Sequence, residues 1–546
     1  MLLFEIILFQ DRIQTLFIIN FMNMNNMKIT KTSIFHPFLF AIFPIISTYS
    51  INMQELLPHH LIQPIIIISV FTIIMFFIAR LVFKNWAKAG VIVSLIIGLM
   101  FSYGHLYLQI AGFELGGIII GRHIILIIPY IIAFFAIGFY VFRTKNNFKN
   151  ITKILNVIGI TLILVSVINI STYAIENNGL GIVILEDEKI KDKIGTGINI
   201  QDEKRISLVG NLEYYPDVYF ILLDGYGGTT SLKNDLGFDN SNFIKLLEEK
   251  GFFVVPNSHS NYPQTFLSIP STMNMKYLNY LGDILGSESK DQLTTMNMMK
   301  NSLVIEIFKS KGYKTITFPN NSFDEIKVDY KECESTDLLE SNKLMTILNK
   351  INIFEYFLTI LQLEHTRNNQ ECFFTELSEV HKKFEEPVFV FGHILLPHPP
   401  NAFGPNGERV MPRIYYNEWG TEEDEKRYLD TLQYANLRIE GFLEKVLKEN
   451  ERESIIIIAS DHGTDFGFDW KNPSDEMLKQ RFSNLNAYYF PKGKDLLYDN
   501  ITPVNSFRIM FNSNFDGNFE LLDDRSYWSS YDKPFKFRDI TELLND

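Results

Sequence analysis

Cysteine is scarce in this sequence of 546 residues, which contains only Cys333 and Cys372. Two cysteines exclude a disulfide-rich scaffold and a Cys-rich zinc module, and they leave one disulfide bond open. Charge is also scarce up to Ile175, where 11 basic and four acidic side chains occur. The part after Ile175 has a net negative charge, because it contains 39 Lys and Arg against 59 Asp and Glu. This negative charge argues against a nucleic-acid partner, because binding phosphates requires a basic face.

Disorder is excluded by the high apolar content, since 47% of the residues are hydrophobic and 14% are aromatic. Five apolar stretches have about the length that crosses a bilayer, and they are Phe35–Ile51, Leu61–Phe83, Ala89–Ile110, His123–Phe142 and Ile151–Tyr173. The first stretch is short and contains Pro37 and Pro44. Met1–Asn26 is apolar as well, but charged residues interrupt it, so translation from Met1 or from Met27 stays open.

Basic residues flank alternate ends of these stretches, and they are Lys28, Lys31, Arg80, Lys84, Lys88, Arg143, Lys145, Lys149 and Lys153. Basic loops stay in the cytoplasm, so the amino terminus is predicted inside. Five spans then place everything after Tyr173 outside. We therefore expect a multi-pass protein of the plasma (inner) membrane with the lipid bilayer as a partner. A transporter is disfavoured, because His105 is almost the only ionisable residue within the spans.

Three regions follow from this pattern. Residues 1–175 are predicted to be an all-α transmembrane bundle, residues 176–210 a charged linker, and residues 211–546 an extracytoplasmic α/β domain with a mainly parallel sheet. The expected strands are Asp217–Leu223, Phe252–Val255, Lys314–Phe318, Val388–His393 and Ser454–Ala459. Helical spacing is found in Phe243–Lys250, Val304–Lys311 and Glu422–Lys448, and a further helix is expected at Pro503–Arg508.

Chemically active side chains follow three of these strands at their carboxyl ends. Asp224 follows the first strand, Asp461 and His462 follow the run of isoleucines, and His393 and His398 follow Val388–Phe391. Ligands of open α/β sheets bind at this edge. Two carboxylates and up to three imidazoles at one place would be costly without a cation. Oxygen and nitrogen ligands of this kind suit zinc, manganese or magnesium.

A possible nucleophile lies in the segment Asn261–Asn274, where a loop meets a helix. The amino terminus of a helix favours an anion, and a hydroxyl that also touches a divalent cation is easily deprotonated. Thr265 is therefore a candidate nucleophile, although a threonine at this position often only caps the helix. Arg481 could reach a phosphate, but a solvent-facing arginine is the commoner case.

The order of Asp224-Gly225, Thr265, His393/His398 and Asp461-His462-Gly463 resembles the alkaline phosphatase superfamily. Within it, the chain resembles sulfatase-like membrane enzymes, namely lipoteichoic acid synthases and phosphoethanolamine transferases. The resemblance implies that Thr265 is the nucleophile and that His398 acts on the leaving group. It also implies the metal-ligand set Asp224, Thr265, Asp461 and His462, and the substrate-binding set His393, His398 and Asn261. Those families usually have Glu at the position of Asp224.

The activity implied is metal-dependent phosphoryl transfer or phosphodiester hydrolysis on lipid- or glycan-linked substrates outside the membrane. One divalent ion is expected, with a second left open because no Asp-x-x-x-His motif is found. Two alternatives remain. Ser268 begins a stretch close to the sulfatase motif Cys/Ser-x-Pro-Ser-Arg, although Thr272 replaces its arginine. A catalytically silent, membrane-anchored binding protein is the other alternative.

Overall fold

The computed structural model describes residues 33–110, 113–115, 118–119, 123–176, 204–300, 302–318, 326–333, 342–349, 353, 355–411 and 420–545. The apolar segment Met1–Asn26 and most of the expected linker, residues 177–203, lie outside these residues. The chain forms two compact units. The apolar helices and the α/β domain are therefore described one after the other.

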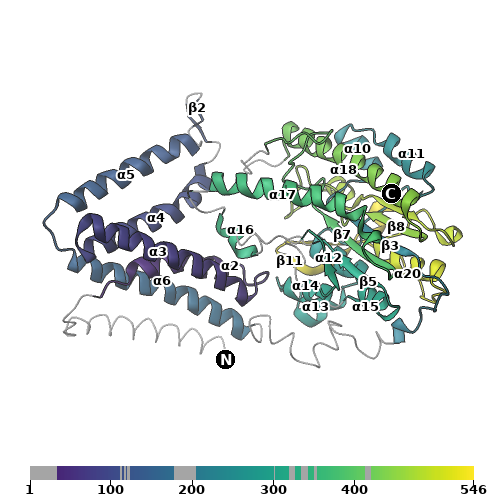
Figure 1. Cartoon of the computed structure of the whole chain (residues 1–546), viewed down its shortest axis with the longest axis horizontal. Coiled ribbons are helices and arrows are strands. Elements are labelled where there is room, and N and C mark those ends of the chain that lie inside the picture. Colours follow the sequence, from purple (N-terminus) through teal and green to yellow (C-terminus); the bar gives the residue numbers. More distant parts are fainter. Residues whose placement is uncertain are drawn as a thin grey trace. The chain divides into compact units, whose positions relative to one another are not determined.

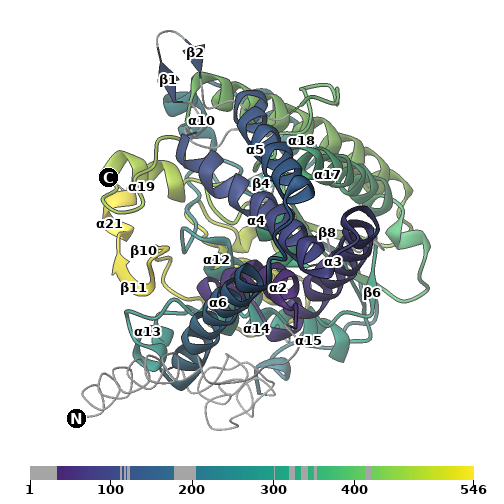
Figure 2. The same cartoon turned by 90° about the vertical axis from the view of Figure 1, so that its left-hand side faces the viewer.

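Five apolar helices form where apolar stretches were expected, and they are α2 (His36–Ile51), α3 (Ile62–Phe83), α4 (Trp86–Ile110), α5 (His123–Arg143) and α6 (Lys149–Glu176) (Figure 2). In the described part of the chain, four helices are long and apolar enough to cross a membrane, and α2 is not among them. Its 16 residues span about 24 Å, less than the roughly 30 Å of a hydrocarbon core. Four of the five expected stretches are thus long enough to be spans, α2 is the short one, and the predicted orientation rests on the basic loops.

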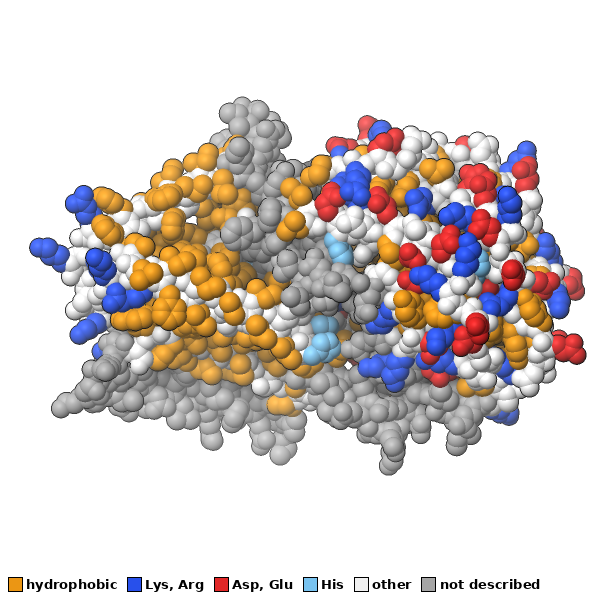
Figure 3. Space-filling view, viewed as in Figure 1, with side chains coloured by type: hydrophobic (Ala, Val, Ile, Leu, Met, Phe, Trp, Pro, Cys, Tyr) orange, Lys and Arg blue, Asp and Glu red, His pale blue; other side chains and the backbone are white. Residues whose placement is uncertain are grey.

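Hydrophobic side chains gather on the outer surface of these helices (Figure 3). Leu81 is 77% exposed and Phe135 is 67% exposed, for example. Lys, Arg, Asp and Glu side chains instead gather over the surface of the α/β domain. An apolar outer surface of this kind suits a lipid environment, because lipid does not penalise exposed hydrocarbon.

A seven-stranded sheet organises the α/β domain (Figure 1), with the order β4-β9-β8-β3-β7-β5-β6. Its strands are β3 (Asp217–Leu223), β4 (Phe253–Val254), β5 (Lys314–Thr317), β6 (Tyr330–Lys331), β7 (Val388–Ile394), β8 (Ser454–Ala459) and β9 (Asn486–Tyr489). Strands β8, β3, β7, β5 and β6 run parallel, whereas β9 is antiparallel to both β8 and β4. The mainly parallel sheet expected from the sequence is confirmed.

Helices cover both faces of the sheet. Alternate residues of the central strands pack with α17 (Glu355–Leu377) and α18 (Glu422–Glu449) on one face. The other face packs with α12 (Thr265–Met273), α15 (Leu303–Ser310) and α20 (Pro503–Asn514). All residues of β3, β7 and β8 are consequently buried, as their continuous apolar sequences predicted.

The remaining elements are shorter. A hairpin of β10 (Tyr527–Ser530) and β11 (Lys533–Asp539) lies near the carboxyl terminus. The other elements are β1 (Glu114–Leu115), β2 (Ile118–Ile119), α10 (Thr229–Leu236), α11 (Ser241–Glu249), α13 (Tyr280–Leu285), α14 (Leu293–Lys300), α16 (Lys343–Asn349), α19 (Asp475–Phe482) and α21 (Thr541–Asn545). Strand β9 and this hairpin were not expected from the sequence.

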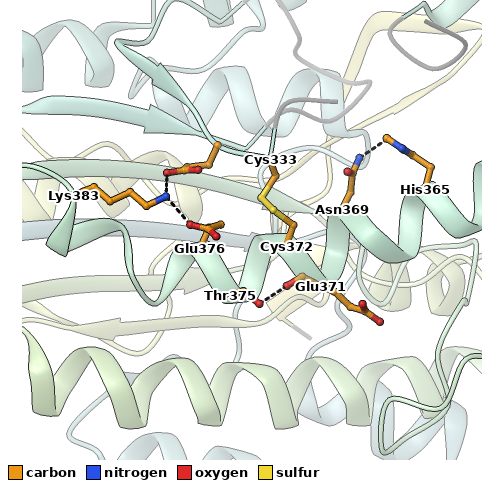
Figure 4. The surroundings of a disulfide bond; sticks show 9 residues. Cys333, His365, Asn369, Glu371, Cys372, Thr375, Glu376 and Lys383 are labelled. Atoms are coloured by element: carbon orange, nitrogen blue, oxygen red, sulfur yellow. Dashed lines mark hydrogen bonds and ion pairs between the residues drawn. A yellow bond between two sulfur atoms is a disulfide. The ribbon is translucent and has the colours of Figure 1, made fainter. Parts of the chain in front are cut away.

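Cys333 and Cys372 form a disulfide bond, which answers the pairing left open by the sequence (Figure 4). It joins the segment after β6, an edge strand, to the carboxyl-terminal third of α17. Nearby, Lys383 forms ion pairs with Glu332 and Glu376. The edge of the sheet is therefore attached covalently to the helix that covers it.

Replacing both cysteines with serine is expected to destabilise the α/β domain by about 2–4 kcal/mol, because the unfolded chain regains the freedom that the cross-link removes. Thermal unfolding of the full-length protein in detergent should show a melting temperature lower by about 5 °C or more. Wild-type protein treated with a reducing agent is the control and should melt like the double variant. Equal melting temperatures for the variant and the oxidised wild type would contradict this expectation.

Candidate metal and nucleophile site

Two adjacent parallel strands bring the site carboxylates together. Asp224 follows β3 and Asp461 follows β8, and the pairing of Leu222 with Ala459 keeps the two strand ends level. Gly225 then turns the chain with a φ of +70°, a conformation that glycine adopts without strain. Its backbone N–H donates a hydrogen bond to Asp461 Oδ1 at 3.2 Å. The turn after one strand thus orients the carboxylate that follows the other.

Asp224, Asp461 and His462 each offer a ligand atom, and these three atoms lie within 4.8 Å of one another. All three side chains are buried. His462 Nδ1 donates a hydrogen bond to the Gly463 carbonyl oxygen at 3.0 Å. The unprotonated Nε2 therefore faces the carboxylates, 3.2 Å from Asp461 Oδ2 and 3.8 Å from Asp224 Oδ1.

These residues fit a divalent cation. Asp224 Oδ1 is buried and has no hydrogen-bond partner among the described residues. A buried carboxylate oxygen without a partner is costly, and a cation would remove that cost. Two carboxylates and one imidazole are a ligand set that zinc or manganese accepts. The chain thus has a buried Asp/Asp/His candidate metal site.

The local charges favour the ligand forms of these groups. Burial raises the pKa of Asp224, but the neighbouring His398, His393 and His462 outweigh it, so this pKa lies well below its usual range. Burial lowers the pKa of His462, and the Arg481 charge lowers it further. A carboxylate and a neutral imidazole are the forms that bind a metal ion, so both shifts keep the site ready for one near neutral pH.

Thr265 lies within contact of this cluster. It is the first residue of α12, and its hydroxyl group donates a hydrogen bond to Asp461 Oδ2 at 2.6 Å. Its Oγ1 atom is 3.2 Å from His462 Nε2. The residue at the cap position is Gln264, which makes no side-chain capping bond. The hydroxyl of Thr265 is therefore directed at the metal-site residues and does not cap the helix.

Helix α12 is held firmly on all sides, because every residue from Phe266 to Met273 is buried. Just after its carboxyl end, the guanidinium groups of Arg205 and Arg508 both donate hydrogen bonds to the Met275 carbonyl oxygen. Ser268, the alternative nucleophile, lies one turn along the helix and donates a hydrogen bond to the Asp461 carbonyl oxygen at 2.8 Å. The Ser268 hydroxyl is thus bound to the backbone, whereas that of Thr265 faces the ligand atoms.

The two histidines expected at the site both lie beside Asp224. His393 is buried, and its Nε2 donates a hydrogen bond to Asp224 Oδ2 at 3.1 Å. His398 is exposed, and its backbone N–H donates to the Asp224 carbonyl oxygen at 3.1 Å. A Cβ atom at Gly225 would lie 3.7 Å from His462 and 3.9 Å from His398, so both side chains flank this glycine. His398 therefore reaches solvent at the edge of the cluster.

The side chain of Asn261 has a structural role, in contrast to the two histidines. Its side-chain N–H donates to the Arg525 carbonyl oxygen at 2.8 Å, and its Oδ1 accepts from the Val504 N–H at 2.8 Å. The side chain is fully buried. These bonds attach the loop before α12 to α20 and to the chain that leads into β10. The predicted contact of Asn261 with substrate receives no support from this geometry, because its amide group is engaged by the backbone.

Arg481 belongs to the surroundings of the site, although the sequence favoured a solvent-facing arginine. It is 3% exposed, and its Nε and Nη1 donate to the carbonyl oxygens of Pro263 and Gly463 at 2.8 and 3.2 Å. Its guanidinium group lies 5.1 Å from the centre of the Trp470 ring. Nothing in the local sequence indicates this burial, because it depends on the distant loop at Pro263.

The sulfatase family model matches residues 216–509, which is more than half of the chain. The chain belongs to the sulfatase family. Its α/β domain is a sulfatase-family enzyme domain, and the resemblance to the alkaline phosphatase superfamily is confirmed. No curated protein matches the sequence.

Similar solved structures include the following three. The C-terminal periplasmic domain of EptC from Escherichia coli is 12% identical, with a TM-score of 0.39, and covers 61% of this chain and 95% of that domain. The integral membrane protein lipooligosaccharide phosphoethanolamine transferase A from Neisseria meningitidis is 13% identical, with a TM-score of 0.31. The match covers 83% of this chain and 88% of that protein. The phosphonate monoester hydrolase of Agrobacterium radiobacter is 11% identical, with a TM-score of 0.37. The match covers 57% of this chain and 80% of that enzyme. Similarity at this level carries no information about the substrate of this sulfatase-family chain.

Proposed function

We propose that this protein is a metal-dependent phosphoryl transferase or phosphodiester hydrolase, which acts outside the membrane on lipid- or glycan-linked substrates. The observation that carries the proposal is the position of Thr265, whose hydroxyl donates to Asp461 Oδ2 at 2.6 Å and lies 3.2 Å from His462 Nε2. A hydroxyl held among metal-site residues at a helix amino terminus is suited to attack a phosphate anion.

The metal ion would be held by Asp224, Asp461 and His462, with Thr265 as a fourth ligand. A bound divalent ion would favour the deprotonated hydroxyl and would neutralise charge on the phosphate oxygens. We propose one such ion, zinc, manganese or magnesium. His393 donates to Asp224 Oδ2 at 3.1 Å and would hold that carboxylate in place. A second ion remains open.

The reaction would proceed in two displacements. In the first, Thr265 gives its proton to solvent, its Oγ1 attacks phosphorus, and the bond from phosphorus to the leaving oxygen breaks. His398 gives its proton to that leaving oxygen. In the second, water or an acceptor hydroxyl attacks phosphorus and gives its proton to His398. The bond from phosphorus to Thr265 breaks, and Thr265 takes a proton from solvent.

Water as the second nucleophile makes the protein a hydrolase, and an acceptor sugar or lipid makes it a transferase. The apolar helices would keep the domain at the bilayer, where such substrates are anchored. Two observations support an extracytoplasmic domain. Disulfide bonds persist in oxidising compartments, and Cys333 is bonded to Cys372. The loops Phe83–Trp86 and Arg143–Lys149 carry basic residues, as cytoplasmic loops do.

Turnover of two reporters tests the reaction class. The full-length protein in detergent is incubated with bis(4-nitrophenyl) phosphate or 4-nitrophenyl sulfate, in the presence of Zn²⁺, Mn²⁺ or Mg²⁺. We expect metal-dependent release of nitrophenol from the phosphodiester and at least about 100-fold slower release from the sulfate ester, since a threonine cannot be converted to the aldehyde hydrate of sulfatases. Preference for the sulfate ester would favour the alternative with Ser268. No turnover of either reporter, with the metal bound, would favour a binding protein.

A further inference from the structure

The β10–β11 hairpin lies along the loop that leads to Thr265, although it follows residue 509, where the sulfatase-family match ends. Ser526 Oγ donates to the Ser260 carbonyl oxygen at 2.7 Å, and the Tyr527 N–H donates to the Asn261 carbonyl oxygen at 2.9 Å. Gln264 Nε2 donates to the Ser529 carbonyl oxygen at 3.1 Å. The hairpin is thus anchored up to the residue directly before Thr265.

The turn of this hairpin places an aromatic side chain beside the site. Tyr531 lies between β10 and β11, with its ring centre 4.4 Å from that of Trp470 and 6.2 Å from that of Phe266. Phe266 directly follows Thr265 in α12. Tyr531 nevertheless keeps 46% of its surface exposed. We call Phe266, Trp470 and Tyr531 the aromatic wall.

The hydroxyl group of Tyr531 lies within electrostatic reach of the metal-site carboxylates. Burial raises its pKa to about 12, Arg481 opposes this rise, and the charges of Asp465, Asp224 and Asp461 add to it. Tyr531 therefore lies beside the site through its contact with Phe266, with almost half of its side chain exposed. A substrate at Thr265 would meet this ring.

Several charges around the wall form ion pairs. Arg481 lies over the Trp470 ring at 5.1 Å and forms an ion pair with Asp465 at 3.8 Å. At the hairpin turn, Asp532 pairs with Lys290 at 3.0 Å, and Lys533 pairs with Glu288 at 2.8 Å. The guanidinium group over Trp470 would repel a cationic ligand, whereas an uncharged ligand meets no such repulsion. The wall therefore favours an uncharged ring.

We propose that Tyr531, packed on Trp470, binds a sugar ring esterified to the phosphate that Thr265 attacks, which makes Tyr531 a specificity-determining residue. This inference rests on the proposed function. The C–H face of a sugar is apolar and slightly positive, so it complements the negative face of an aromatic ring. The hydroxyl groups at the edge of the sugar remain free to contact solvent and polar side chains. Among glycan- and lipid-linked phosphodiesters, the aromatic wall selects those with a sugar next to the phosphate.

The test compares two phosphodiesters that share their leaving group, glucose 6-(4-nitrophenyl phosphate) and methyl 4-nitrophenyl phosphate. For the full-length protein with metal, Tyr531→Ala is expected to raise KM for the sugar diester about 10-fold and to change KM for the methyl diester less than about twofold. The kcat values for both should stay within about twofold. Tyr531→Phe keeps the ring and should retain the wild-type ratio of the two KM values.

Two further variants guard against misfolding and surface effects. Tyr531→Leu preserves apolar packing on Trp470 without an aromatic face. Like Tyr531→Ala, it should raise KM for the sugar diester. Tyr330→Ala is the matched control, because Tyr330 is 43% exposed and packs on Phe384 at the edge strand β6. It should change neither KM.

The outcomes separate this inference from the proposed function. If wild-type protein hydrolyses both diesters and Tyr531→Ala alters both KM values equally, the sugar subsite is wrong and the reaction class stands. If the wild type hydrolyses neither diester with metal bound, the proposed function is wrong and the subsite falls with it. A folded Tyr531→Leu variant with the wild-type KM ratio would also overturn the subsite.

Discussion

Replacing Thr265 with alanine is expected to lower phosphodiester turnover at least about 10³-fold, while the divalent ion is still bound by Asp224, Asp461 and His462. The variant loses the oxygen that attacks phosphorus. A water molecule in its place would not be held in position by α12, as the Thr265 hydroxyl is. The same variant should lose the covalent adduct. Intact-mass measurement after rapid acid quenching should detect one added phosphoryl ester on the wild type and none on Thr265→Ala.

Two companion variants sharpen this test. Thr265→Ser keeps a hydroxyl at the same position and should retain measurable turnover and the adduct. Thr375→Ala is the matched control, since Thr375 is exposed on α17 and its hydroxyl donates to the Glu371 carbonyl oxygen. It should behave as the wild type. Wild-type turnover by Thr265→Ala, or an adduct on another residue, would refute the assignment of the nucleophile.

Replacing Asp461 with asparagine is expected to weaken binding of a divalent ion at least about 100-fold and to abolish turnover. The change removes one of two carboxylate charges from the buried cluster and the acceptor of the Thr265 hydroxyl hydrogen bond. The bound metal is measured by elemental analysis after dialysis, and the affinity by titration calorimetry of the metal-free protein.

Stability provides a second readout for the metal. Added Zn²⁺ or Mn²⁺ should raise the melting temperature of the wild type and leave that of Asp461→Asn unchanged, because a ligand stabilises only the state that binds it. Asp499→Asn is the control, as Asp499 is exposed in the loop before α20. An equal metal content in Asp461→Asn and the wild type would show that the triad is not the metal site.

The central strands could be predicted from the sequence because they are buried on both faces. Ser454–Ala459 and Asp217–Leu223 are apolar after their first residue, and their observed bounds agree with the prediction. Strand β9 escaped prediction because its apolar run is only three residues long. Its first residue, Asn486, is buried while its side chain donates a hydrogen bond to the Tyr488 hydroxyl. The bounds of α2 agree to within one residue with the apolar stretch Phe35–Ile51, which was already recognised as short for a span.

The metal-site residues could be predicted because a rule of topology places them. The carboxyl ends of parallel strands meet at one edge, so Asp224 and Asp461 had to be close once their strands were neighbours. The position of Asn261 next to the nucleophile in sequence gave no such guidance, because its side chain points to Arg525 and Val504. Burial of Arg481 and the Cys333–Cys372 bond likewise depend on segments that are distant along the chain.

The attachment of the hairpin to the loop before Thr265 makes the nucleophile depend on a remote part of the sequence. Ser526 bonds to Ser260 and Ser529 to Gln264, across more than 260 positions of the chain. A variant truncated before the hairpin would lack this support even when its sheet has formed. Damage confined to the hairpin is therefore expected to impair Thr265 while the sheet stays intact.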